Sequence, residues 1–146
     1  KNEWANRATS IISANDLRVK LQALVNYFPS TNGAFIHIEV EPVIPITNEL
    51  RVVVAFYEDS IVKPQKDWQL GDIQDYVHRD LLKFHVNGDM FGQKIDNEYL
   101  NTNGKYYYDY SLKIPADYTA ENSHLLIYVF DKVTNEIYQV IKKKFI

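Results

Sequence analysis

Along most of the chain, hydrophobic and polar residues alternate at the two-residue spacing of β-strands. This spacing predicts half-buried strands at residues 17–27, 36–40 and 105–114. Two other runs, Leu50–Tyr57 and Leu125–Phe130, are almost unbroken apolar sequence, which is typical of strands covered on both faces. A last strand is predicted at Ile137–Ile146, where three consecutive lysines would protect an exposed sheet edge from aggregation.

The first residues follow a different pattern. Within Glu3–Ser13, apolar side chains recur at helical spacing, at Trp4, Ala8, Ile11 and Ile12. We therefore expect a short linker helix within residues 1–14, followed by a single domain over residues 15–146. The polar stretch Glu58–Asp75 predicts a long loop inside that domain.

About seven strands separated by turn signals, without alternating helices or internal repeats, predict an all-β protein. The expected architecture is an antiparallel β-sandwich, immunoglobulin-like or jelly-roll, with a short N-terminal helix. Composition agrees, because branched and aromatic side chains fit a pleated surface and this chain has 11 Tyr, 7 Phe and 2 Trp.

Length and charge narrow the function classes. A chain of 146 residues can bury a core without cross-links, and the absence of cysteine excludes disulfide scaffolds, zinc fingers, iron–sulfur proteins and thiol enzymes. A net charge of −3 and a pI near 5.8 argue against a nucleic-acid partner. No apolar run is long enough to span a membrane.

Four histidines are the first candidates for chemistry. His78 and Asp80 lie two residues apart in a strand-like segment, so they would project from one face and could share a metal ion or a proton. Two ligands are too few for a metal site, and we expect none. His37 and His85 are predicted to face solvent, and His124 to be structural.

Two carboxylates follow the predicted strand Leu50–Tyr57 directly. Glu58 and Asp59 could act as acid and base. Neighbouring residues on an extended chain point to opposite faces, however, so we interpret the pair as a solvated loop entrance. A metal-dependent hydrolase using Glu58, His78 and Asp80 is one alternative function.

Aromatic residues supply another alternative. Tyr106, Tyr108 and Tyr110 share a face with apolar neighbours and are predicted to be core. Tyr107 is left outside, and together with Trp68 and Tyr76 it could form a platform that binds a carbohydrate or a peptide. The sequence has no nucleophile-elbow, phosphate-loop or dinucleotide-binding motif. We therefore expect neither a cofactor nor an enzyme.

Several short sequence segments together resemble those of one protein family. The segments are Glu58–Gln65, Tyr76–Lys83, Asn87–Gly92, Tyr128–Asp131 and Glu136–Val140. Over essentially its whole length the chain is similar to the C-terminal domain of the outer membrane protein 28-related lipoproteins of Bacteroides-type bacteria. It departs from the family's usual H-N-H-x-L-R phrase, with Asp80 where a second histidine is common and Lys83 where arginine is common.

The resemblance implies a location and a neighbour. The expected precursor is secreted and lipid-anchored, with the membrane contacted only through that anchor. The protein would lie in the cell envelope, associated with the outer membrane and facing the periplasm or the exterior. A thioredoxin-like domain would precede the sandwich in the parent chain, joined through Glu3–Ser13, and would be its first partner.

The leading hypothesis is therefore a non-catalytic module of an envelope lipoprotein, with a binding, spacer or domain-packing role and a protein or glycan as ligand. The family transfers no catalytic residue to this chain. The residues expected to face a ligand are Glu58, Asp59, Gln65, Trp68, Tyr76, His78, Asp80 and Tyr107.

Overall fold

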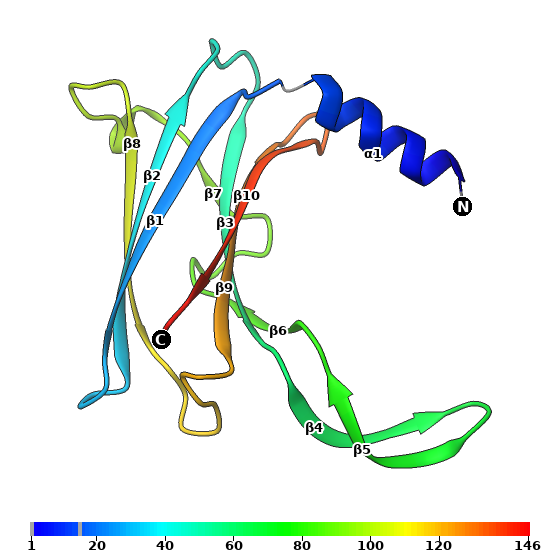
Figure 1. Cartoon of the computed structure of the whole chain (residues 1–146). Helices are drawn as coiled ribbons and strands as arrows, with labels where there is room; N and C mark the ends of the chain where they lie inside the picture. Colours follow the sequence, from blue (N-terminus) through cyan, green and yellow to red (C-terminus); the bar gives the residue numbers. More distant parts are fainter. Residues whose placement is uncertain (1, 15) are drawn as a thin grey trace.

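The computed structural model describes residues 2–14 and 16–146. Its body is two antiparallel β-sheets packed face to face, from which a helix and a separate two-stranded hairpin project (Figure 1). The smaller sheet holds, in spatial order, β1 (Val19–Phe28), β2 (Gly33–Pro42) and β8 (Tyr106–Lys113). The larger holds β10 (Ile137–Lys144), β9 (Ser123–Asp131), β3 (Leu50–Glu58) and β6 (Leu81–His85), with the short β7 (Gln93–Lys94) also paired to β3.

The chain crosses between the sheets in a fixed order. It makes the β1–β2 hairpin, crosses to β3, returns to place β8 beside β2, and crosses again to add β9 and β10. This is the immunoglobulin-like order, in which the first, second and fifth strands oppose the third, sixth and seventh. The predicted antiparallel β-sandwich is confirmed, and so are the six strands predicted by alternation or apolar runs, with ends shifted by a few residues.

The core lies between the sheets. Val52, Val54 and Phe56 of β3 are fully buried in it, and they face an equally buried apolar row on β2. Phe56 stacks on Phe84 of β6, with ring centroids 4.7 Å apart. Burying each such side chain stabilises the fold by about 1.5–3 kcal/mol. On β8, Tyr108 is buried and its neighbours of the same parity are partly buried, so the predicted core face is confirmed.

The loop predicted at Glu58–Asp75 is wrong, because this segment belongs to a hairpin. It consists of β4 (Ile61–Asp67) and β5 (Gly71–His78), which pair only with each other and project from the sandwich (Figure 1). The Asp67 carboxylate accepts the backbone N–H groups of Gln69 and Leu70, both at 2.8 Å, and so fixes the turn. The hairpin covers no core, so its sequence lacks the alternation that reveals a half-buried strand.

The predicted N-terminal helix is confirmed as α1 (Asn2–Ala14), which extends away from the sandwich (Figure 1). Its apolar stripe is not covered: Trp4 is 80% exposed, and Ile11 and Ile12 are similarly open. The predicted domain boundary between residues 14 and 15 stays a prediction, because residues 1 and 15 lie outside the described part.

Gly92 shows how closely one loop approaches β3. The segment between β6 and β7 crosses the face of β3 that points away from the core and buries Val53 completely. Gly92 has a φ of +74°, and a Cβ added there would lie 2.4 Å from the Val52 carbonyl oxygen. Gly88, in the same loop, has a φ of +73° with open space around it.

These two glycines make a matched pair of substitutions. Gly88→Ala should cost about 1–2 kcal/mol of unfolding free energy, the penalty of a left-handed conformation. Gly92→Ala should cost about 1–3 kcal/mol more, because the added methyl group overlaps backbone. Denaturant unfolding of both variants measures the difference, and equal losses would show that the contact with β3 is loose.

Candidate functional site

A hollow of about 410 Å³ lies on the outer face, the face of the five-stranded sheet that points away from the core. At its centre is Ala55 of β3, which pairs with Leu126 of β9 on one side and with His85 of β6 on the other. Around this small residue stand the longer side chains of Tyr57, Leu82, His85, Leu126 and Tyr128. The hollow therefore follows from one short side chain among long ones on a single sheet face.

Polar groups line one side of the hollow. Tyr57 is only 5% exposed, and within the described residues no acceptor takes its buried O–H group. The Lys142 amine lies close enough to the Tyr57 hydroxyl oxygen for that oxygen to raise the pKa of Lys142. The Lys142 amine lies 5.1 Å from the centroid of the Tyr57 ring and donates to the Asp80 carboxylate at 3.2 Å. His124 stacks on Tyr57 at 5.2 Å, and burial lowers the pKa of this imidazole.

The solvated loop entrance predicted for Glu58 and Asp59 is wrong for Glu58. Glu58 ends the central strand β3 and is buried, with its carboxylate 3.1 Å from the Lys83 amine. Asp59 is partly exposed and contacts Arg79 at 3.4 Å. The two carboxylates have different partners, as expected of neighbours on an extended chain.

His78 and Asp80 do not share a strand face. β5 ends at His78, whose ring packs edge-on against Tyr76 at 4.9 Å. Asp80 has a φ of 47°, so the backbone turns between the two residues and sends the carboxylate to Lys142. Nowhere in residues 2–14 and 16–146 do three His, Asp or Glu side chains gather as a metal site would require.

The three platform aromatics lie on different elements. Tyr107 is on β8 in the smaller sheet, where its hydroxyl donates to Glu39 at 2.8 Å. The pKa of Glu39 is lowered, first by the Lys105 amine and then by this hydroxyl. Trp68 lies in the turn of the β4–β5 hairpin and is 95% exposed, while Tyr76 lies on β5. Gln65, on β4, faces partly outward on the same hairpin.

His37 and His85 were both predicted to face solvent, and the structure separates them. His37 is exposed and contacts Asp109 at 2.6 Å, so the predicted solvent-facing position is confirmed. For His85 that prediction is wrong, because the ring is partly buried in the wall of the hollow. Sequence reasoning also missed Ala55, Tyr57 and Lys142. The sequence did hold one sign of the hollow: Ala55 and Tyr57 lie two residues apart in the apolar run Leu50–Tyr57, so a short and a long side chain share one face of that strand.

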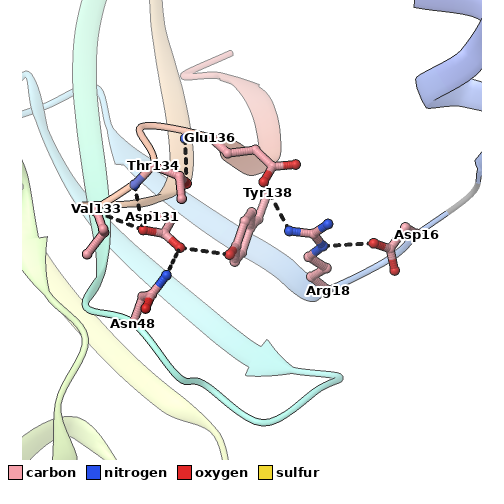
Figure 2. Close-up of polar contacts among 8 residues, drawn as sticks. All are labelled: Asp16, Arg18, Asn48, Asp131, Val133, Thr134, Glu136 and Tyr138. Atoms are coloured by element: carbon pink, nitrogen blue, oxygen red, sulfur yellow. Dashed lines mark hydrogen bonds and ion pairs between the residues drawn. The ribbon is translucent and has the colours of Figure 1, made fainter.

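A second polar cluster surrounds Asp131, at the end of β9 (Figure 2). Its carboxylate is fully buried and accepts four hydrogen bonds. They come from the side chains of Asn48 and Tyr138, at 2.8 and 2.9 Å, and from the backbone N–H groups of Val133 and Thr134, at 2.7 and 3.0 Å. The Asn48 amide and the other donors lower the pKa of Asp131 to about 2.

Tyr138 extends this cluster toward α1 (Figure 2). The Arg18 guanidinium lies 5.0 Å from the centroid of the Tyr138 ring. It donates to Asp16 at 2.8 Å and to Glu136 at 3.0 Å. Both ion pairs are partly exposed, so each contributes little alone, but they hold the chain just after α1 against the β9–β10 turn.

Comparison with known proteins gives the family. The model of the outer membrane protein Omp28 family matches residues 4–145. The chain belongs to the Omp28 family. Among solved structures, this Omp28 domain is similar to a domain of the outer membrane lipoprotein Omp28 from Porphyromonas gingivalis, with a TM-score of 0.61 and 18% identity over 87% of each chain. That likeness establishes the fold.

Family membership also confirms the predicted association with the outer membrane and the cell envelope. No helix in the described part of this Omp28 domain is long and apolar enough to cross a membrane. Among curated proteins, none matches the sequence significantly.

The Asp131 cluster predicts a pH dependence of stability. An unfolded aspartate has a pKa of about 3.9, and the folded value near 2 is lower. The stabilisation is therefore present above about pH 4 and is lost as pH falls through about 2, where the folded carboxylate takes up its proton.

Unfolding free energies of the wild type and of Asp131→Asn, measured from pH 7 to pH 2, test this dependence. The variant should be less stable at pH 7, because the amide of asparagine has one oxygen in place of two and cannot accept all four bonds. The difference in unfolding free energy between the wild type and the variant should narrow below pH 4. Asp117→Asn, in the loop before β9, serves as a control, and its unfolding free energy should stay close to that of the wild type at every pH measured. A difference for Asp131→Asn that stays constant with pH would contradict the argument.

Proposed function

We propose that this Omp28 domain is a non-catalytic packing module, which holds a folded protein domain between two projecting arms. The arms are α1 and the β4–β5 hairpin. The observation that carries the proposal is the exposure of their apolar side chains, with Trp4 at 80% on one arm and Trp68 at 95% on the other. The only two tryptophans of the chain thus lie uncovered on its two projections.

The arrangement of the arms supports one shared partner. Figure 1 shows both leaving the sandwich on the same side, the side of the five-stranded sheet. Ile11 and Ile12 extend the apolar surface of α1, and Leu70 lies beside Trp68 in the hairpin turn. Large apolar side chains grouped on projections are typical of surfaces that another protein covers.

The geometry gives less support to the alternatives. A hydrolase would need Glu58, His78 and Asp80 to converge, whereas their side chains contact Lys83, Tyr76 and Lys142 respectively. A carbohydrate platform would need Tyr107 beside Trp68, whereas Tyr107 lies on the smaller sheet and Trp68 in the turn of the projecting hairpin.

The partner we propose is the thioredoxin-like domain that the family resemblance implies before the sandwich. Such a domain would continue directly into α1, so it would meet the apolar stripe of the helix without any further association step. The covalent connection through α1 raises the effective concentration of this domain at the hairpin, so weak contacts with the hairpin are enough to keep it bound there.

Hydrogen exchange measured on the full encoded polypeptide and on the 146-residue chain tests the proposal. Amides of α1 and of Gln69 and Leu70 should exchange at least about tenfold more slowly in the longer protein, which corresponds to about 1.4 kcal/mol of added protection. Thr31 and Asn32, in the β1–β2 turn, are the internal controls and should not change. Equal rates in both proteins at the two arms would contradict the proposal.

A variant sharpens this test. In the full polypeptide, replacing Trp68 and Leu70 by serine should raise exchange in α1 as well, because one partner bridges both arms. Phe35→Ser, an exposed apolar residue on the smaller sheet, is the matched control and should leave α1 unchanged. A hairpin change that affects only the hairpin would show that the arms do not share a partner.

A further inference from the structure

We propose that the hollow around Ala55 is a binding site for an apolar group that carries a carboxylate. The site goes beyond the packing role of the arms, because it is built from side chains of the sheet itself and needs no contact with α1 or with the hairpin turn. Its test is correspondingly independent of theirs.

The shape of the hollow suits the apolar part of such a ligand. Its volume of about 410 Å³ falls in the range of small-molecule sites. Leu82, Leu126 and the ring of Tyr128 form apolar walls, and the short side chain of Ala55 leaves the floor open. An aromatic ring or a branched aliphatic chain placed there would contact apolar groups on several sides.

The Tyr57 hydroxyl indicates a hydrogen-bonding head on that ligand. It belongs to a side chain that is 95% buried and lines the hollow, and its O–H finds no acceptor among the described residues. The neighbouring Lys142 amine can only donate to the hydroxyl oxygen, so it leaves this O–H free. A buried hydroxyl left unpaired is costly, so an acceptor that enters the hollow and takes this O–H gains more than it would from a hydroxyl already paired.

Charge identifies that acceptor as an anion. Lys142 and Lys144 alternate onto the outer face of β10, paired in register with Leu126 and His124. Two carboxylates lie on this side: Asp80, which Lys142 neutralises at 3.2 Å, and Asp59, which pairs with Arg79. Lys144 lies at the next outward-facing position beyond the hollow and forms no ion pair within the described residues, so this edge of the outer face has a net positive charge. A carboxylate near Tyr57 would accept a hydrogen bond from its O–H and lie beside the Lys142 amine.

The same chemistry has two sources, a free small acid and the C-terminal residue of a polypeptide. Both present an apolar side group next to a carboxylate. The test therefore uses one probe of each kind.

Amide chemical shifts of the ¹⁵N-labelled 146-residue chain, followed during titration with 3-phenylpropionate, test the site directly. Saturable shifts should centre on Ala55, His85 and Leu126. The neutral amide 3-phenylpropionamide should bind about tenfold more weakly, since a charged acceptor makes the stronger hydrogen bonds. Unsaturable or scattered shifts, or equal affinity for the amide, would overturn the proposal.

Substitutions locate the site. Ala55→Leu should abolish the saturable shifts by filling the floor, and Tyr57→Phe should weaken binding about tenfold by removing the donor. Tyr107→Phe, which removes an exposed tyrosine hydroxyl on the opposite sheet, is the matched control and should bind as the wild type does. The spectrum without ligand shows whether each variant is folded. A folded Ala55→Leu that still binds would overturn the assignment to the hollow.

A short peptide ending in phenylalanine, with a free or an amidated C-terminus, separates the two sources. Tighter binding of the free-acid peptide than of 3-phenylpropionate supports a polypeptide terminus as the ligand. Tighter binding of 3-phenylpropionate supports a small acid. Equal binding of the free and amidated peptides would contradict the need for a carboxylate.

Discussion

The buried carboxylate of Asp131 is the interaction on which the geometry of this domain depends most. Removing an ionised carboxylate from water costs several kcal/mol, and the fold recovers that cost only if hydrogen bonds replace the lost water. Asp131 receives four, from the segment before β3, from the β9–β10 turn and from β10 itself. Because these donors come from three parts of the chain, none of the parts can move without leaving a charge unpaired.

The contacts around Asp131 extend toward α1. The Tyr138 hydroxyl donates to Asp131, and the ring of Tyr138 lies beside the Arg18 guanidinium, which in turn donates to Asp16, two residues beyond the end of α1. A chain of contacts thus connects the interior to residues 16–18, the segment that follows α1. The other arm is held differently, by the Lys83–Glu58 and Arg79–Asp59 pairs at its base.

The sandwich could be predicted because its strands are half buried, and burial on one face imposes a period of two on the sequence. The β4–β5 hairpin could not, since both of its faces meet solvent and selection for burial leaves no pattern there. Glu58 was misplaced for another reason: its partner Lys83 lies far along the chain, on a strand whose register is set by tertiary pairing. The hollow could not be predicted either, because its position depends on the strand register. Ala55 forms the floor of the hollow only because Leu126 and His85 lie opposite it on the neighbouring strands.

The way the hairpin joins the sandwich makes it separable from the rest. Glu58 at the end of β3 is paired directly with Leu81 at the start of β6, so the two points where the hairpin leaves and rejoins the sheet are adjacent. Residues 59–80 are therefore an insertion between two strands that a short turn could connect. Changes in the length of this segment would leave the pairing of the sandwich strands intact, because the hairpin supplies none of the residues between which the two sheets pack.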